Sequence, residues 1–586
     1  MLNFLKSILK SVFVTLISFF VILSVLVLIG LSTSQSDGET TINDQTVLEI
    51  RLNENIVDRS SEFDFDINSL MNEDIALGLN QILKSIEKAR YDDRVKGIYL
   101  NVQSINAGSA TINEIRHKLQ TFKDSTDKFI VAYSEVYTQS AYYLSSVAHK
   151  VYLHPEGAIE FKGLSYEGMF FKGALEKLNV EAQIIRHGKF KSAVEPYILD
   201  KMSVENREQV SLFVSTIWNN LKSQIAQSRN LSISKLDNIA DSLLVKSAKD
   251  AVEYHLADAL LYEDQVNDTL KKLIQVQPDD KVTKVSLKEY ASVGVNTGKK
   301  YSKDKIAIIY AQGTINSGKG DNQSIGSETT SKAIRKARKD DKIQAIVLRV
   351  NSPGGSALAS ETILREMELA KTVKPVIVSM GDVAASGGYY IACKADTIVA
   401  NPTTITGSIG VFGVVPNIEG MLENKLGITT DRVNTNKYSD LGSITRPLTT
   451  REKAIIKNQI ERIYDTFISH VASGRNLKKE DVDAVGQGRV WTGEDAKRLG
   501  LVDVLGGLED AVSIAAKMAN IDNYRVTNLP KLKNPIEEFF TDFSVQIKHK
   551  LIKDEIGQSY LYYKQLNEIQ NMDRIQMRMP MQFEIY

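Results

Sequence analysis

The chain has 586 residues, of which 43% are hydrophobic and 25% charged, a globular composition that argues against wholesale disorder. Its 72 basic and 72 acidic residues cancel, which gives no electrostatic basis for a nucleic-acid partner. The single cysteine, Cys393, excludes an intramolecular disulfide and a cysteine-based metal cluster, and the seven histidines form no His-Glu-x-x-His pair. We therefore expect neither a metal nor another cofactor.

The first predicted element is a membrane-spanning helix over Val12–Leu31, a run of 20 residues without a charge. A helix of that length can cross about 30 Å of hydrocarbon. Lys6 and Lys10 precede the run and Asp37 follows it, so the positive-inside rule places the N-terminus in the cytoplasm and the rest of the chain across the membrane. A cleaved signal peptide is the alternative, but its apolar core is typically only about 7–15 residues long.

Two copies of one design follow the predicted anchor. The segment Lys88–Ile98 recurs as Lys336–Ile346, a shift of 248 residues, with the same Lys-Ala-Arg and Asp-Asp groups. Further matches at nearly the same shift are Tyr142-Tyr143 with Tyr389-Tyr390, Arg229–Leu231 with Arg475–Leu477, and Asp250-Ala251 with Asp495-Ala496. Such a period is far too long for a solenoid repeat and indicates two homologous domains.

In the first copy, Lys191 lies in a partly apolar loop, Gly188–Pro196. A lysine acts as a general base only when its amine is neutral, and desolvation against apolar surface can lower its pKa by several units from about 10.4. His187, four residues earlier, is a rival base, and an ordinary surface lysine is the structural alternative.

The second copy begins after a polar, lysine-rich stretch, Asp279–Lys305, which predicts a linker. Short apolar strands then alternate with segments of helical length, which is typical of βαβ units in a mainly parallel sheet. The predicted strands are Ile306–Tyr310, Ala345–Val350 and Val376–Ser379, and the predicted helices are Ser327–Lys339 and Ser360–Lys371. Long amphipathic stretches, Glu205–Ala226 and Arg451–Ala472, should pack on the outside of the two copies.

Two glycine turns follow strands of the second copy. Asn351–Ser356 reads Asn-Ser-Pro-Gly-Gly-Ser, and Gly381–Tyr390 reads Gly-Asp-Val-Ala-Ala-Ser-Gly-Gly-Tyr-Tyr. Both lie at the carboxyl ends of strands, where open α/β sheets place their sites. The backbone N–H of Gly354 or Gly355, with that of Gly387, could form a two-donor oxyanion hole. No Walker or Rossmann motif accompanies these turns, which disfavours phosphate binding.

Ser386 lies in the second turn, between a strand and a helix, where free N–H groups favour developing negative charge. Position 384 is alanine, so the turn is not the Gly-x-Ser-x-Gly elbow of α/β-hydrolases. Ser386 is a candidate nucleophile, with N-capping of the following helix as its structural alternative. A nucleophilic serine needs a base, and neither turn contains a histidine, which leaves Lys191 as a candidate.

Together these features resemble the long, duplicated form of the signal peptide peptidase A family of Ser/Lys proteases, over roughly residues 1–525. The matching motifs are the two glycine turns, Lys191–Pro196, and Thr406–Val411, which reads Thr-Gly-Ser-Ile-Gly-Val. The resemblance implies an α/β fold with two tandem ClpP/crotonase-like domains, preceded by the transmembrane helix. It implies Ser386 as nucleophile, Lys191 as general base, and Ser408 as the residue that orients the lysine.

The resemblance also implies a biological setting. Members of the family cleave signal peptides that remain in the membrane after preprotein processing, and the long form assembles into a homotetramer. Peptides and the membrane are thus the expected partners, and the bacterial inner membrane is the expected location, with the catalytic body on the extracytoplasmic side. The predicted divisions are the anchor (1–32), the first repeat (45–278), the linker (279–303), the second repeat (304–525) and a C-terminal extension (526–586).

Each copy retains one half of the expected dyad. The residue that corresponds to Ser386 in the first copy is Gln139, and the residue that corresponds to Lys191 in the second is Ser439. Gln103–Ala107 of the first copy also lacks the Pro-Gly-Gly turn. The site must therefore form where a first copy meets a second copy.

Two other classes of function were weighed against the protease. A crotonase-type acyl-CoA enzyme would share the fold and the oxyanion hole but would need neither Lys191 nor an export anchor. A catalytically silent membrane scaffold would not react with a serine-directed probe. The Met-rich C-terminal end shows no signal that we can interpret.

Overall fold

The computed structural model of the chain describes residues 42–60, 76–296, 298, 301–532 and 575–579, together with positions 14, 15, 17, 18 and 21. The predicted anchor, Val12–Leu31, lies outside the described residues over most of its length. Among the helices that these ranges contain, none is both long and apolar enough to cross a bilayer.

A six-stranded parallel sheet forms the centre of the first repeat, in the order β8-β6-β5-β4-β1-β9. Its strands are β1 (Thr46–Ile50), β4 (Val95–Leu100), β5 (Phe129–Tyr137), β6 (Lys150–Ile159), β8 (Ala259–Leu260) and β9 (Lys284–Ser286). Its helices include α2 (Leu79–Tyr91), α3 (Ser109–Ser125), α4 (Gln139–Ser145), α8 (Ile233–Asp241), α9 (Ala248–Glu253) and α10 (Glu263–Ile274). Apolar clusters lie on both faces of the sheet, which is why its strands are so apolar.

The second repeat is built in the same way, in the order β19-β17-β15-β13-β10-β21, with β16 between β15 and β20. Its strands are β10 (Lys305–Gln312), β13 (Ile343–Ser352), β15 (Val376–Ala385), β16 (Thr397–Ala400), β17 (Ile405–Gly407), β19 (Val490–Thr492), β20 (Val504–Leu505) and β21 (Arg525–Leu529). Its helices include α12 (Ser327–Lys339), α13 (Ala357–Lys371), α14 (Gly387–Ala392), α17 (Lys479–Val485), α18 (Gly493–Arg498) and α19 (Leu508–Met518). Each of these helices begins 245–248 residues after its counterpart in the first repeat, which confirms the predicted duplication.

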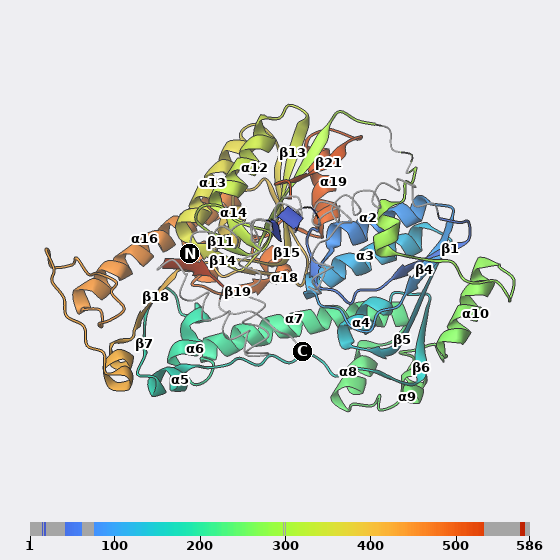
Figure 1. Cartoon of the computed structure of the whole chain (residues 1–586), viewed down its shortest axis with the longest axis horizontal. Helices are drawn as coiled ribbons and strands as arrows, with labels where there is room; N and C mark the ends of the chain where they lie inside the picture. The colour runs from blue at the N-terminus through green and yellow to red at the C-terminus, as the bar shows by residue number, and fades with distance from the viewer. Residues whose placement is uncertain are drawn as a thin grey trace.

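A third, mixed sheet joins the two repeats and a C-terminal segment, in the order β12-β11-β14-β22-β18-β7. Its strands are β7 (Glu181–Arg186), β11 (Thr314–Asn316), β12 (Ser324–Gly326), β14 (Gly354–Ser356), β18 (Phe412–Asn417) and β22 (Ile575–Arg578). Strand β7 comes from the first repeat and pairs antiparallel with β18 of the second. In Figure 1 the first repeat, in blue and cyan, lies to the right, whereas β7 reaches across to β18 at the left.

Two long helices, α7 (Val204–Arg229) and α16 (Thr450–Arg475), cover the repeats. A Ser or Thr side chain caps each N-terminus, and each helix ends at a left-handed asparagine. Both helices bury an apolar stripe, as their amphipathic patterns predict, and α7 runs along the lower side of the molecule in Figure 1. Shorter helices, α5 (Lys172–Lys177), α6 (Glu195–Ile198) and α15 (Glu419–Met421), flank β7 and β18.

The predicted linker, residues 279–303, is partly folded into the first repeat. Strand β9 pairs with β1, and the following helix α11 (Leu287–Ser292) packs on α2. Tyr290 of α11 is buried, its hydroxyl donates to Asp92 at 3.1 Å, and its carbonyl accepts a hydrogen bond from Lys88 Nζ at 2.8 Å. The linker prediction is wrong for this stretch, because a few buried apolar positions are enough to fix an otherwise polar segment to the sheet edge.

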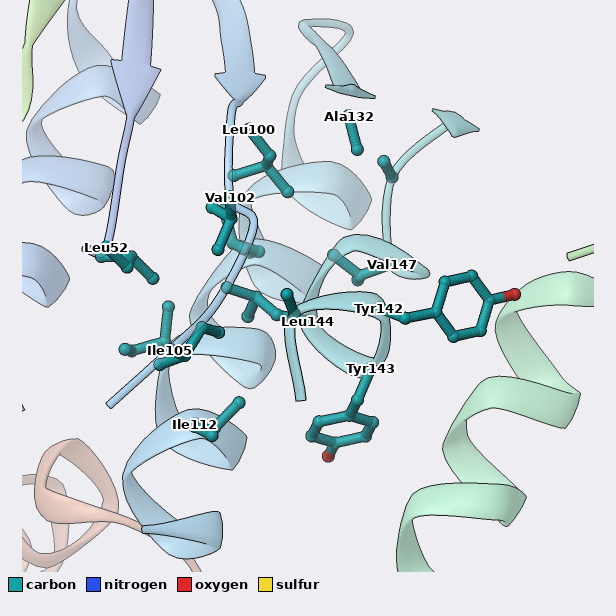
Figure 2. Close-up of a cluster of buried hydrophobic side chains, with 14 of the residues drawn as sticks. Leu52, Leu100, Val102, Ile105, Ile112, Ala132, Tyr142, Tyr143, Leu144 and Val147 are labelled. Atoms are coloured by element: carbon teal, nitrogen blue, oxygen red, sulfur yellow. The ribbon is translucent and has the colours of Figure 1, made fainter. Parts of the chain in front are cut away.

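Figure 2 shows how the core of the first repeat fixes α4, the counterpart of the helix that follows Ser386. Buried residues drawn there include Leu100, Val102, Ile105, Ile112, Leu144 and Val147. Tyr142 is also fully buried, and its hydroxyl donates to the Leu256 carbonyl at 3.0 Å. Its counterpart Tyr389 donates to the Leu501 carbonyl at 2.9 Å. The repeated tyrosine pair therefore has a structural role, since it anchors the helix behind each turn.

A buried charge cluster lies between the repeats. Arg349 of β13 is fully buried, with Nε 2.9 Å from Asp58 Oδ1 and Nη2 2.7 Å from Glu114 Oε1. Both carboxylates belong to the first repeat. On the neighbouring strand, Asp382 accepts hydrogen bonds from the Thr111 N–H at 2.9 Å and the Thr111 hydroxyl at 2.6 Å. These contacts fix the second repeat against the first.

Replacing Arg349 with methionine is expected to destabilise the chain by about 3–5 kcal/mol, because two buried carboxylates lose their cation. The matched control is Arg335→Met, which removes a half-exposed arginine from its pair with Glu366 and should cost less than about 1 kcal/mol. Urea unfolding of both variants measures the difference. Equal losses would show that the cluster does not join the repeats.

Candidate active site

Lys191 of the first repeat meets Ser386 of the second within one chain. Lys191 follows β7, which pairs with β18, and Ser386 follows β15. Lys191 Nζ lies 2.9 Å from Ser386 Oγ although the two residues are 195 positions apart in sequence. Both side chains are fully buried. The structure thus brings together two residues that the sequence analysis assigned to different copies.

Ser386 forms the turn between β15 and α14. Its φ of 55° and ψ of −113° are rare for a residue with a side chain, and such strain clusters at functional sites. Its N–H donates to the Gly407 carbonyl at 2.8 Å, which helps to hold the turn. Its Oγ does not cap α14, so the structural alternative of N-capping is not what this side chain does. The hydroxyl faces the Lys191 amine instead.

The Lys191 side chain is enclosed by glycines and an aromatic ring. A methyl group on Gly488 would lie 2.6 Å from Lys191 Cβ, and one on Gly410 would lie 3.2 Å from Lys191 Cδ. The Phe412 ring centroid is 5.9 Å from Nζ. Burial alone lowers the pKa of Lys191 well below its ordinary value. The site therefore favours a neutral amine, the form that a general base requires.

Ser408 completes the surroundings of the amine. Its Oγ lies 2.9 Å and its carbonyl oxygen 3.1 Å from Lys191 Nζ. Its backbone is held at φ 49°, and its N–H donates to the Arg489 carbonyl at 2.6 Å. A neutral amine has two N–H donors and one lone pair. With Ser386 as the third partner, two donors toward Ser408 leave the lone pair directed at the Ser386 hydroxyl.

The two glycine turns converge beside Ser386. Gly354 has φ +98°, and a methyl group on it would lie 2.7 Å from the Gly387 N; one on Gly387 would lie 3.1 Å from the Gly355 N. The Gly354 N–H already donates to Ser352 Oγ at 3.1 Å. Of the three glycines that the sequence suggested, Gly355 and Gly387 therefore have N–H groups that can line an oxyanion hole, while Gly354 shapes the turn.

Gln139 occupies the position in the first repeat that corresponds to Ser386. Its Oε1 accepts hydrogen bonds from the N–H groups of Lys162 at 3.1 Å and Gly163 at 3.0 Å. Its Nε2 donates to the Gly163 carbonyl at 3.0 Å. The amide thus fills the space beside α4 with structural hydrogen bonds.

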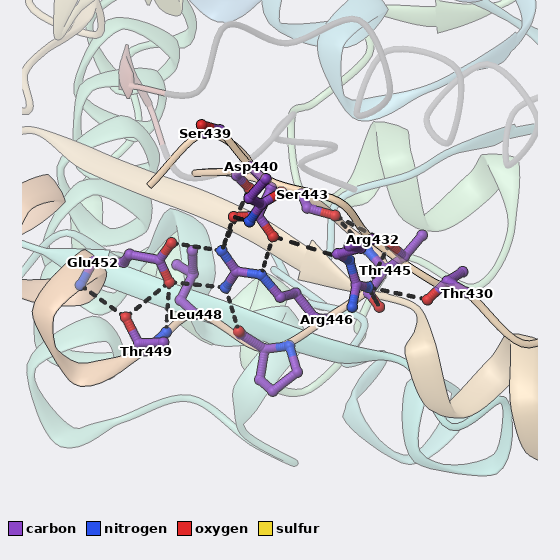
Figure 3. A network of polar contacts seen from close by, with 12 residues as sticks. Thr430, Arg432, Ser439, Asp440, Ser443, Thr445, Arg446, Leu448, Thr449 and Glu452 are labelled. Carbon is purple, nitrogen blue, oxygen red and sulfur yellow. Dashed lines mark hydrogen bonds and ion pairs between the residues drawn. The ribbon is translucent and has the colours of Figure 1, made fainter. Parts of the chain in front are cut away.

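Ser439, at the position that corresponds to Lys191, is exposed in the loop between β18 and α16. Figure 3 shows this loop, which Arg446 ties together. Arg446 Nε lies 2.6 Å from Asp440 Oδ2, and its Nη2 lies 2.6 Å from Glu452 Oε1. Hydrogen bonding to Arg446 lowers the pKa of each carboxyl to about 2. The second repeat has built a fixed polar loop where the first repeat supplies its lysine.

His187, the rival base, is directed elsewhere. Its Nδ1 lies 2.6 Å from Glu461 Oε2, and its ring stacks on Tyr464 with 3.7 Å between centroids. Its N–H donates to the Val411 carbonyl, which attaches the end of β7 to the second repeat. His187 therefore packs behind the lysine loop and makes no hydrogen bond to Ser386.

Two features of the site were missed in the sequence. Gln209 of α7 is buried; its Nε2 donates to Ser192 Oγ at 2.7 Å, and its Oε1 accepts the Val490 N–H at 3.1 Å, which fixes the residue after Lys191. The other is Ile575–Met579, which lies against the first glycine turn as β22. The alternating pattern Ile-Gln-Met-Arg-Met is a weak strand signal that could have found the second.

Other reactive groups do not form a second centre here. Within the described ranges, no group of three or more His, Cys, Asp and Glu side chains is arranged to hold a metal ion. Cys393 is fully buried, and its burial raises the pKa of the thiol to about 12. That thiol is therefore a poor nucleophile.

Comparisons with known proteins match both repeats. The sequence model of peptidase family S49 matches residues 122–277 and 368–522. Protease 4 of Salmonella typhi is 38% identical over 459 residues, which cover 76% of this chain and 73% of that protein. The chloroplastic serine protease SPPA of Arabidopsis thaliana is 35% identical over 465 residues, which cover 78% of this chain and 68% of that protein.

Among solved structures, a mutant of ClpP1 from Listeria monocytogenes matches with a TM-score of 0.24 and 17% identity. The match covers 35% of this chain and 94% of ClpP1. A similarity of that extent does not identify a shared fold. The α/β architecture and its duplication are observed, and the ClpP/crotonase-like fold stays a prediction.

Proposed function

The chain belongs to peptidase family S49, and from that premise we propose that it cleaves peptide bonds through an acyl-enzyme on Ser386, with Lys191 as the general base. Family membership makes the chain a serine protease and removes the case for an acyl-CoA enzyme or a silent scaffold. The observation that carries the proposed dyad is the 2.9 Å contact between a buried amine and a buried hydroxyl.

Lys191 takes the Ser386 proton as Oγ attacks the carbonyl carbon of the scissile bond. The amine is suited to this role because burial keeps its pKa low and Ser408 directs its lone pair. The resulting ammonium gives the proton to the leaving amine, and the peptide C–N bond breaks. Water then attacks the acyl ester, with Lys191 again as the base, and the Ser386 hydroxyl is restored.

The oxyanion that forms in each step needs hydrogen-bond donors in place before the reaction. The Gly355 and Gly387 N–H groups lie beside the Ser386 turn and meet that requirement without side-chain movement. Loss of one such donor typically slows an enzyme by about 10²–10³-fold.

The proposed substrates are signal peptides that remain in the membrane after preprotein processing. The apolar run Val12–Leu31, preceded by Lys6 and Lys10, supports a single-pass anchor with the catalytic body on the extracytoplasmic side of the bacterial inner membrane. Resemblance to the long family form supports a ClpP/crotonase-like fold for both repeats and a homotetramer.

The substrate proposal is tested by incubating the full chain with synthetic signal peptides in detergent micelles and identifying fragments by mass spectrometry. A folded protein without apolar extended segments is the control substrate. Cleavage within the apolar cores of the signal peptides, with the folded protein intact, is expected. Hydrolysis of the folded protein alone would contradict the proposal.

Activity should rise with pH and reach a plateau. Below the Lys191 pKa the amine is protonated and cannot accept the Ser386 proton, and the pKa of this buried group is lowered, so the midpoint should lie well below 10.5. His187→Ala should leave the profile of kcat/KM against pH unchanged. A midpoint that disappears in His187→Ala would make the histidine the base.

Ser408→Ala should slow hydrolysis by about tenfold, because the amine loses one hydrogen-bond partner worth about 1 kcal/mol and keeps the Ser408 carbonyl. As a positioning residue, Ser408 should act through the lysine, so the midpoint of the pH profile should also shift. A slower enzyme with an unshifted midpoint would argue against that role.

A further inference from the structure

The C-terminal strand β22 fills a slot in the third sheet beside the proposed active site. It pairs antiparallel with β14 on one side, where Gly355 faces Met577, and with β18 on the other, where Phe412 faces Gln576. Strand β14 contains the glycine turn, and β18 follows the segment that contains Ser408. Without β22, a gap one strand wide would separate β14 from β18.

The backbone of β22 crosses the oxyanion donors. The Met579 N–H donates to the Pro353 carbonyl at 2.6 Å. Hydrogen-bonded pairs recur every second residue in an antiparallel ladder, so Gly355 and Met577 also form such a pair. A methyl group on Gly354 would lie 2.1 Å from the Met577 carbonyl oxygen and 2.7 Å from the Gly387 N. The Met577 carbonyl therefore lies where the two donors converge.

The side chains of β22 fit the slot at alternate positions. Met577 is fully buried in the core of the second repeat, and Met579 is 5% exposed, against Ala385 and Val490. Ala385 directly precedes Ser386. Extended backbone pairing combined with pockets for alternate side chains is the way in which sheet edges bind peptides.

We propose that residues 575–579 occupy the peptide-binding slot of the enzyme in cis and compete there with substrate. This inference rests on the proposed function, since it assigns the slot between β14 and β18 to the substrate. The occupant belongs to the same chain, so it competes through an effective concentration that free peptides must exceed. The slot takes an extended peptide with long apolar side chains at alternate positions, as Met577 and Met579 are.

A purely structural strand makes the opposite prediction. If β22 only completes the sheet, weakening it exposes apolar surface, and both stability and peptide binding fall. If β22 is a competitor, weakening it opens the slot, and binding of an external peptide improves. The direction of the change therefore separates the two roles.

The test measures fluorescence anisotropy of a labelled heptapeptide with the sequence of residues 574–580, Arg-Ile-Gln-Met-Arg-Met-Pro. All proteins are full-length chains with Ser386→Ala, so that nothing is cleaved. Met577→Asp, which places a charge in an apolar pocket, should lower the Kd of the peptide by about tenfold or more. The control Met577→Leu keeps an apolar occupant and should bind the peptide as weakly as the parent chain. Unchanged or weaker binding by folded Met577→Asp would overturn the proposal.

A second pair of variants covers the case in which Met577→Asp does not fold. Met579→Pro removes the N–H that donates to Pro353 and leaves the core residue Met577 in place, whereas Met579→Leu keeps the donor. Tighter binding by the proline variant alone supports the competitor, and equal binding by the pair overturns it. Because the assay needs no catalysis, a failure of the Ser/Lys mechanism would not change its result.

Discussion

Replacing Ser386 with alanine is expected to lower kcat/KM for peptide hydrolysis by at least about 10³-fold, because the acyl-enzyme can no longer form. The fold should persist, since both residues are small and the hydrogen bonds that hold the turn come from the backbone. The measurement is hydrolysis of a fluorogenic peptide by purified full-length protein, with the thermal unfolding midpoint as a check of the fold.

Ser331→Ala is the matched control for this variant. The Ser331 hydroxyl is buried on α12 and has no hydrogen-bond partner among the described residues, so its removal should leave activity unchanged. If Ser386→Ala keeps even a tenth of the parent activity while Ser331→Ala behaves normally, another group is the nucleophile.

Replacing Lys191 with arginine should also lower kcat/KM by at least about 10³-fold. A guanidinium stays protonated at every accessible pH, so it cannot accept the Ser386 proton. The loss should persist as pH is raised, in contrast to the parent enzyme, whose activity rises as the amine deprotonates. Assays from neutral to alkaline pH with the same fluorogenic peptide measure both effects.

Lys189→Arg is the matched control, because Lys189 lies two residues earlier in the same loop and is exposed. It should show the parent pH profile and rate. A Lys191→Arg chain that regains activity at high pH would mean that a different base titrates there.

The sequence was sufficient to place the chemistry because its motifs follow strands. Ser386 and the glycine turns come directly after buried apolar runs, and the carboxyl ends of parallel strands meet at one edge. The meeting of Lys191 with Ser386 followed from the duplication, since Gln139 and Ser439 cannot take their places. Local patterns thus predicted a contact across 195 residues.

Other features depend on tertiary geometry and could not be predicted. Only the structure shows that Ser352 engages the Gly354 N–H, which leaves Gly355 as the donor. The five-residue pattern of Ile575–Met579 is too short to indicate a strand until the gap between β14 and β18 is known. Composition likewise hid β9 in the predicted linker, because three residues that complete a sheet edge need little apolar character.

The most direct test of the Ser/Lys dyad is covalent labelling with a fluorophosphonate, followed by mass spectrometry of the modified peptide. The account predicts a single label on Ser386, formed faster as pH rises in the parent chain and at a rate reduced at least about 10³-fold in Lys191→Arg at every pH. A label on another residue, or equally rapid labelling of Ser386 in the Lys191→Arg chain, would contradict it.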